Sequence, residues 1–300
     1  MKTNLIFTLL ACTLFLTTSC FDDSPNLNET GRLRVQMVDA PFPFDQVTEA
    51  NVTVFKIDAR LKEGEIITED DEATDEDAEE MDAPFVVLME EEIPLNLLDL
   101  VNGTTASLAD LEVPAGTYDL VRVYVKGINV VLTDGTEYDL KVPSGAQTGI
   151  KVFINPGLTV VGGLSADLLL DFDVSKSFVA KGNTKIAGGI NGFNFKPVIK
   201  ASNMSTAGTL KGNVSTLVEE TPLGLEGALV EIFNETDTLT TFSDIDGNYI
   251  IMGIPAGSYR ITAGLETYVQ SDTLSAEVNA ANSTVQDFLL EAEPIVEGGN

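Results

Sequence analysis

Short runs in which apolar and polar residues alternate are the feature that most constrains this chain. Residues 136–142 alternate without a break, and Leu33, Val35 and Met37 alternate with polar neighbours in the same way. A period of two places apolar side chains on one face of a strand, whereas a helix needs a period near 3.6. Helical periodicity is weak, and residues 93–101, with a continuation near residues 107–111, are the one stretch expected to form a helix or a turn. The sequence therefore predicts an all-β fold.

Turn residues separate these runs. Asp134-Gly135 lies between residues 129–133 and 136–142. Asp-Gly at such a place favours a hairpin with a type I′ turn, which needs positive φ at both central residues. Many short strands with Gly, Pro and Asn between them indicate a sandwich or an open barrel. Further strands are expected at residues 118–125, 150–154, 166–172 and 193–199.

Two similar hexapeptides link the halves of the chain. Residues 113–118 read Val-Pro-Ala-Gly-Thr-Tyr, and residues 254–259 read Ile-Pro-Ala-Gly-Ser-Tyr. In each, an apolar strand is expected to end at the Pro-Ala-Gly turn, and a strand that begins near the Tyr follows. The repetition indicates that both halves use a related architecture.

The chain has 300 residues, which is room for about two domains. It becomes small and polar around residues 202–207, and a new set of strands begins at Thr209. We therefore expect two Greek-key, prealbumin-like β-sandwich domains in tandem, at residues 31–203 and 207–291, followed by an acidic tail at 292–300. The inward positions of the second are expected to be Leu210, Val214, Val230, Ile232, Tyr259 and Ile261.

The N-terminus is predicted to be a targeting segment. Residues 1–19 have a short basic start, an apolar run of about twelve residues and small residues before Cys20. That run is shorter than the roughly 20 residues that cross a bilayer. The segment resembles a bacterial lipobox, although Thr17 stands where that motif usually has Leu. The resemblance implies that Cys20 is acylated and that residues 20–30 are a tether; the alternative is an ordinary signal peptide with an incidental Cys.

The start of the tether carries a second resemblance. Phe21-Asp22-Asp23-Ser24 is similar to the acidic run that sends Bacteroidota lipoproteins to the outer cell surface. This implies a lipid-anchored protein of the outer membrane, exposed at the surface, with the membrane as a partner through its acyl chains.

Composition excludes several classes of function. The chain has 17 basic and 47 acidic residues, so a nucleic-acid partner is excluded by charge. It has no His, which removes a triad base and a His-ligated zinc. Its two cysteines, Cys12 and Cys20, both lie in the first twenty residues, so the folded body has no disulfide or thiolate site. We expect no cofactor, no metal and no enzyme activity.

Residues 63–83 form an acidic insertion in the first domain. Ten of the fourteen residues from Glu69 to Asp82 are acidic. Like charges repel and stay solvated, so a solvated, extended loop is expected. A loop that attracts Ca²⁺ is the alternative, although the acids follow no ligand spacing.

One pair of carboxylates is a candidate for chemistry. Asp171 and Asp173 lie two apart on a predicted strand and so face the same side. Such a pair could act as acid and base on a glycoside or could bind Ca²⁺. The structural alternative is that they flank Phe172 on the solvent face of an edge strand, with Leu168 and Leu170 facing the core.

Two further patterns are weaker candidates for a functional site. Asp244-Ile245-Asp246-Gly247 begins like a calcium loop, but the twelfth position is Pro255 rather than Glu, which predicts a hairpin turn instead. Tyr249 and Tyr259 could stack on sugar rings, but a Tyr that begins a strand is more typical of a core or corner residue.

Both domains resemble known families. Residues 208–290 are similar to the carboxypeptidase regulatory-like domain, a transthyretin-type sandwich that is an accessory domain and not catalytic. The residues that carry this are Pro222, Gly227–Ile232, Thr241–Tyr249 and Ile254–Tyr259.

Residues 31–200 resemble the domain of unknown function 4382, which is common in Bacteroidota lipoproteins. The resemblance rests on residues 31–41, 99–103, 113–118, 142–145, 149–151, 171–173 and 196–199. It implies architecture and location more than activity.

These features together predict a non-catalytic cell-envelope lipoprotein that acts as a surface binding module, with carbohydrate or a protein as candidate ligand. A structural, assembly or adhesion subunit is the first alternative, since sheet edges can accept an added strand. A hydrolase with paired carboxylates is the second.

Overall fold

The computed structural model describes residues 30–40, 46–62, 84–142, 147–186 and 188–294. Within them the chain is built from strands, which confirms the all-β prediction. The signal segment, most of the tether with Cys20, and the acidic insertion lie outside the described residues. No helix in the described ranges is both long and apolar enough to cross a membrane.

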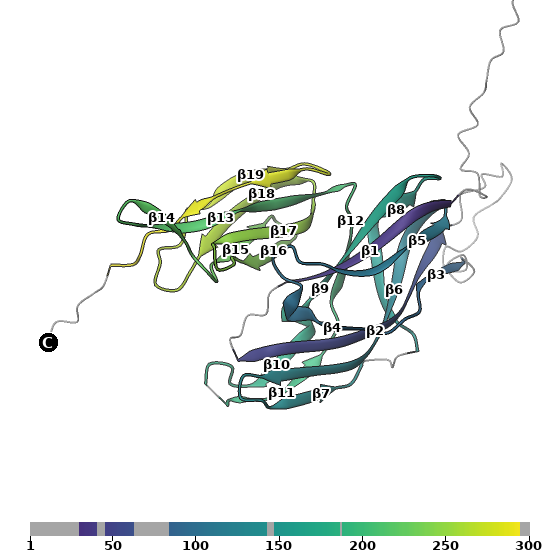
Figure 1. Cartoon of the computed structure of the whole chain (residues 1–300), viewed down its shortest axis with the longest axis horizontal. Helices are drawn as coiled ribbons and strands as arrows, with labels where there is room; N and C mark the ends of the chain where they lie inside the picture. The colour runs from purple at the N-terminus through teal and green to yellow at the C-terminus, as the bar shows by residue number, and fades with distance from the viewer. Residues whose placement is uncertain (1–29, 41–45, 63–83, 143–146, 187, 295–300) are drawn as a thin grey trace, which may run out of the picture.

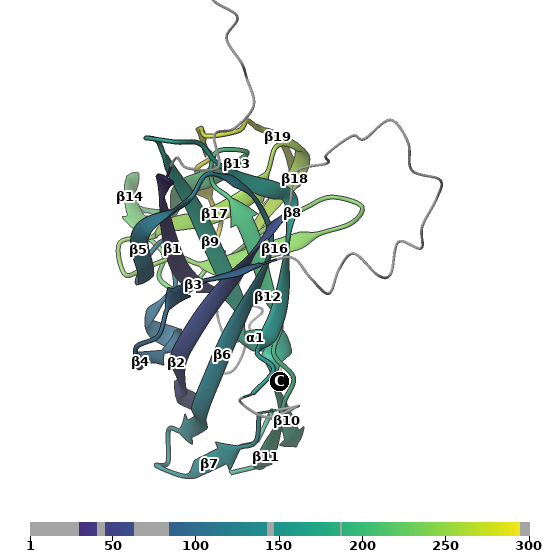
Figure 2. The ribbon, with the colours of Figure 1, turned by 90° about the vertical axis from the view of Figure 1, so that its right-hand side faces the viewer.

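The N-terminal unit is built on one ten-stranded sheet. Its strands follow the order β3-β2-β6-β8-β12-β9-β1-β5, with β4 beside β2 and β7 beside β6. The sheet curls, so that β3 and β5 at its two ends come into contact (Figure 2). The strands are β1 Thr30–Ala40, β2 Val47–Lys62, β3 Phe85–Met89, β4 Ile93–Asn96, β5 Ala106–Pro114, β6 Gly116–Leu132, β7 Glu137–Leu140, β8 Ile150–Val160, β9 Ser165–Asp173 and β12 Ile199–Asn203.

Four short elements complete this unit. A 3-10 helix η2 covers Leu97–Asp99, and the single-turn helix α1 covers Val174–Ser177. β10 (Phe178–Gly182) and β11 (Ile190–Phe195) form a separate two-stranded sheet.

The C-terminal unit is a sandwich of two sheets. One has the order β14-β13-β17, with β20 and β21 also paired to β13, and the other has the order β16-β15-β18-β19. The strands are β13 Ala207–Val218, β14 Thr221–Gly224, β15 Leu229–Phe233, β16 Thr238–Phe242, β17 Asn248–Pro255, β18 Gly257–Gly264, β19 Leu274–Val278, β20 Ser283–Val285 and β21 Phe288–Leu289.

Each unit has its own hydrophobic core. In β1, Leu33, Val35 and Met37 are fully buried and Arg32 and Arg34 are exposed, as the alternation predicts. The six inward positions predicted for the C-terminal unit are all buried in the second core. Figure 1 shows the two units next to each other, and β16 and β17 contact strands of the first.

Several predicted boundaries were wrong. The strands expected at 118–125 and 129–133 are one strand, β6, which continues through Gly127 at φ +57° because β2 pairs with it on both sides of that point. The strand expected at 193–199 is split between β11 and β12. The stretch at 93–101, expected to be a helix or a turn, is β4 followed by η2. Its expected continuation at 107–111 lies in strand β5, which pairs with β1.

The Asp134-Gly135 hairpin is present, but the predicted turn type was wrong. Gly135 alone of the pair has positive φ, at +82°, and its N–H donates to the carbonyl of Leu132. The turn is therefore a three-residue hairpin loop in which Gly135 takes the left-handed position.

The two Pro-Ala-Gly corners share one geometry. Tyr118 Oη donates to the carbonyl of Pro114 at 2.9 Å, and Tyr259 Oη donates to the carbonyl of Pro255 at 3.0 Å. Both tyrosines are buried, and burial raises the pKa of Tyr118 to about 12. The sequence repeat therefore reflects a repeated corner in which each Tyr satisfies the carbonyl before its own turn.

Candidate functional site

The predicted carboxylate pair lies in the interior of the first sheet, not on an edge strand. β9 is paired with β1 on one side and with β12 on the other. Leu168, Leu170 and Phe172 are buried, as expected, but Asp173 is buried too. The edge-strand prediction was wrong because the partners of β9 come from distant parts of the chain.

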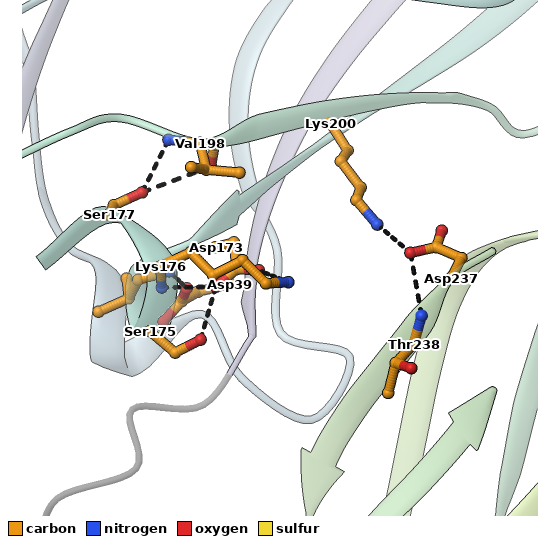
Figure 3. A network of polar contacts seen from close by, with 10 residues as sticks. Asp39, Asp173, Ser175, Lys176, Ser177, Val198, Lys200, Asp237 and Thr238 are labelled. Carbon is orange, nitrogen blue, oxygen red and sulfur yellow. Dashed lines mark hydrogen bonds and ion pairs between the residues drawn. The ribbon is translucent and has the colours of Figure 1, made fainter. Parts of the chain in front are cut away.

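Asp173 has a structural role at the N-terminus of α1 (Figure 3). Its carboxylate accepts hydrogen bonds from Lys176 N at 2.9 Å, Ser175 Oγ at 2.7 Å and Lys176 Nζ at 2.6 Å. Burial alone would raise the pKa of Asp173, but these donors hold it below its usual value. A carboxylate with these partners stays ionised and is a poor proton donor.

Asp171 is in a different environment. It lies opposite Lys200 in the register of β9 and β12, but the Lys200 ammonium is bonded to Asp237 instead, at 2.5 Å. Among the described residues, no side chain or backbone group donates a hydrogen bond to the Asp171 carboxylate. Burial, together with the nearby charge of Asp173, raises the pKa of Asp171 to about 6.

Asp171 lines two neighbouring hollows between the units, and we call the pair of hollows the interdomain groove. Each has a volume of about 270 Å³. Both are lined by Asp171, Lys200, Leu239 and Met252, so side chains of both units form the walls. Cavities between domains are common sites for small ligands.

Direct hydrogen bonds hold the walls of the groove together. Asn102, in the loop after η2, donates to the carbonyl of Asn248 at 3.0 Å and accepts from Ile250 N at 2.6 Å. Ser202 Oγ donates to the carbonyl of Gly253 at 2.9 Å. The Lys200–Asp237 ion pair also crosses between the units (Figure 3). These contacts fix the shape of the groove.

An exposed aromatic ring stands at the mouth of the second hollow. Phe153 in β8 is 64% exposed, whereas its neighbours Val152 and Ile154 are buried. It is the one exposed aromatic ring in the part of the chain that the structure describes. Asn155, Lys200, Ser202 and Asp237 line the same hollow. A flat apolar face beside several hydrogen-bonding groups suits a ligand that has both kinds of surface.

The other predicted candidates take structural roles. Tyr249 is fully buried and donates to the carbonyl of Gln286, and Tyr259 is the corner residue described above, so neither ring is open to a sugar. Asp244 Oδ1 accepts from Asp246 N and Asn248 N in the turn between β16 and β17. The turn is present as predicted, but the hairpin prediction was wrong, because β16 pairs with β15 and β17 pairs with β13 in the other sheet. No group of three or more acidic, Cys or His side chains in the described ranges is placed to hold a metal ion.

Sequence reasoning missed the residues that build the groove, above all Phe153, Lys200 and Asn102. The signal for Phe153 was available, because strict alternation in residues 150–154 places it opposite Val152 and Ile154. The other two are recognisable only once the units are assembled.

No curated protein sequence matches this chain. Among solved structures, it is similar to the minor pilin GBS52 of Streptococcus agalactiae, with 10% identity, a TM-score of 0.27, and coverage of 89% of this chain and 99% of that one. The shaft pilin SpaA of Lactobacillus rhamnosus GG gives 12% identity, a TM-score of 0.27 and coverage of 89% and 99%. A candidate carbohydrate-binding protein of Pseudomonas aeruginosa gives 12% identity and a TM-score of 0.22, over 29% of this chain and 91% of that one.

These TM-scores are too low to carry an argument about function, which therefore rests on the chain's own residues. The family of the chain is established without these structures, because one family model matches more than half of the chain. That match covers residues 30–197, close to the range expected from the sequence. The chain belongs to the family described as Domain of unknown function (DUF4382).

Proposed function

We propose that this protein is a non-catalytic, lipid-anchored module of the bacterial outer-membrane surface that binds carbohydrate in the interdomain groove. The observation that carries the proposal is the exposed Phe153 ring beside the polar side chains of the groove. Sugars present apolar C–H faces and a rim of hydroxyl groups. An aromatic face with hydrogen-bonding groups around it complements both.

The state of the carboxylates supports a binding role over a hydrolytic one. Glycoside hydrolysis needs one carboxyl that donates a proton and a second that acts as base or nucleophile. Asp173 is occupied by three donors, and Asp237 is paired with Lys200 and also accepts from Thr238 N. Asp39, the remaining carboxylate of the groove apart from Asp171, accepts from the backbone N–H of Val174 at 3.0 Å. The three carboxylates of the groove other than Asp171 are thus each engaged by partners within the protein.

A glycan array tests the carbohydrate proposal most broadly. The soluble form, residues 21–300, should bind a subset of glycans, and Phe153→Ala should weaken that binding about tenfold, equivalent to about 1.4 kcal/mol. Val179→Ala is the matched control, because Val179 is an exposed apolar residue on β10 and does not line the groove. Absence of any glycan ligand, or equal binding by Phe153→Ala, would contradict the proposal.

The proposed lipid anchor at Cys20 is tested separately. Cys20→Ala should abolish labelling with a radioactive or clickable fatty acid and release the protein from the membrane fraction, because acyl chains supply the membrane affinity. Cys12→Ala is the control, since Cys12 lies within the predicted signal segment. A Cys20→Ala protein that is still labelled and membrane-bound would show that Cys20 is not the anchor.

An assembly role is the second candidate, because one end of the C-terminal unit is apolar. β14 is the last strand of its sheet, and Leu217, Val218 and Leu223 in the β13–β14 hairpin are all more than half exposed. Such an edge could accept a strand from another chain. Concentration-dependent self-association that is lost in Leu223→Lys would favour this role over glycan binding.

A further inference from the structure

The charges that line the interdomain groove do not balance. Its carboxylates are Asp39, Asp171, Asp173 and Asp237, and its ammonium groups are Lys176 and Lys200. No other charged side chain lines either hollow. The groove is therefore a negative site within a chain that already has 47 acidic and 17 basic residues.

Both ammonium groups already form ion pairs with carboxylates of the groove. Lys176 Nζ is bonded to Asp173 at 2.6 Å, and Lys200 Nζ is bonded to Asp237 at 2.5 Å. Asp39 Oδ1 accepts from the backbone N–H of Val174 at 3.0 Å, at the start of α1. Asp171 is the carboxylate in the groove for which the described residues supply no donor.

Asp171 also lies within reach of a ligand on Phe153. Both residues line the second hollow, so one small molecule resting on Phe153 can reach Asp171 within it. Taking a charge out of water costs free energy unless a partner of opposite charge is supplied. A cationic group on the ligand would be such a partner, whereas an anionic group would meet four carboxylates.

We infer that the interdomain groove selects amino sugars, with the ligand ammonium paired to Asp171 and the sugar ring on Phe153. This inference rests on the proposed carbohydrate function and names its ligand class. It also excludes uronic acids and other acidic sugars as ligands of this site.

The test compares glucosamine oligomers with N-acetylglucosamine oligomers of the same length. The two differ in charge at each amine but share the same ring faces. By calorimetry near pH 7 in moderate salt, residues 21–300 should bind the amino form at least about tenfold more tightly. Asp171→Asn should remove that preference, so that the two forms bind with equal affinity.

A charge control excludes general attraction of a polycation by an acidic protein. Asp139→Asn removes the same charge at an exposed position of β7 that lines neither hollow, and it should keep the full preference. Loss of the preference in Asp139→Asn, or its survival in Asp171→Asn, would overturn the inference.

The remaining outcomes separate the inference from the proposed function. Two outcomes overturn the amino-sugar inference but support the carbohydrate function. In the first, both oligomers bind equally and the binding depends on Phe153. In the second, the protein binds only other, neutral sugars. Absence of binding by every glycan tested overturns both.

Discussion

Asp171 and Asp173 are two residues apart, yet they have opposite chemistry. Asp173 caps α1 and receives donors from Ser175 and Lys176, which hold its pKa low. Asp171 receives none from the described residues, and burial dominates its pKa. Spacing in the sequence placed the two on one face. The donors that lower the pKa of Asp173 come from α1, whereas burial and the charge of Asp173 raise the pKa of Asp171.

The raised pKa of Asp171 predicts a defined dependence of stability on pH. Between its ordinary value of 3.8 and its folded value of about 6, the folded protein keeps a proton that the unfolded chain has released. The contribution of Asp171 to stability therefore falls as the pH rises through this window. Asp171→Asn should have the wild-type melting temperature near pH 4 and a higher one above about pH 7, by calorimetry. Equal shifts at both pH values would contradict the assignment.

At the scale of elements, alternation and turn chemistry predicted much of the fold. β1, β8 and β9 lie where the period-two pattern placed them, and both Pro-Ala-Gly corners formed. The pattern could not predict which strands pair with each other. β9, for example, pairs in parallel with β1, which lies more than a hundred residues earlier in the chain. The prediction of an edge strand failed for that reason, since alternation identifies faces but not neighbours.

The second corner predicts the effect of a single glycine substitution. Gly257 has φ +155°, and the nearest atom to an added Cβ is Tyr259 Cε2 at 3.7 Å, so the cost is one of backbone conformation and not of a clash. Residues 206–293 should fold alone, because they contain a separate core. Gly257→Val should destabilise that fragment by about 1–3 kcal/mol in urea unfolding.

Ser275→Val is the matched control, because Ser275 is an exposed position in β19 where a β-branched residue fits an extended strand. Its free energy of unfolding should stay within about 0.5 kcal/mol of the parent fragment. A fragment without a cooperative transition would mean that the second core depends on the first unit.

At the scale of the whole molecule, the contacts between the units make the site. The walls of the groove come from β1, β8, β9, β12, β16 and β17, together with α1 and the loop after η2. These elements are spread over most of the chain. No local pattern could have brought Phe153, Asp171 and Asp237 together. The sequence indicated a binding module with carbohydrate as a candidate ligand. The location of the proposed site could be recognised only from the contacts between the two units.

Substitution of Asn102 should loosen the contact between the two units. It has φ +54° and bonds β17 through both side-chain amide atoms. Asn102→Gly removes both bonds without backbone strain, because Gly tolerates positive φ. The variant should fold, but small-angle scattering should show a broader distribution of distances between the units. Asn102→Asp keeps the acceptor for Ile250 N and should give an intermediate result; an unchanged distribution in both variants would show that other contacts suffice.

The central claim is that the groove binds sugar, and the methyl group of Met252 reports on it directly. Met252 lines both hollows, whereas Met37 is fully buried in the first core. In residues 21–300 with ¹³C-labelled methionine methyl groups, titration with glucosamine oligomers should shift the Met252 signal, assigned with Met252→Leu, and leave Met37 unmoved. Phe153→Ala should require about tenfold more ligand for the same shift. A saturating glycan that leaves Met252 unchanged while other methionines move would contradict the account.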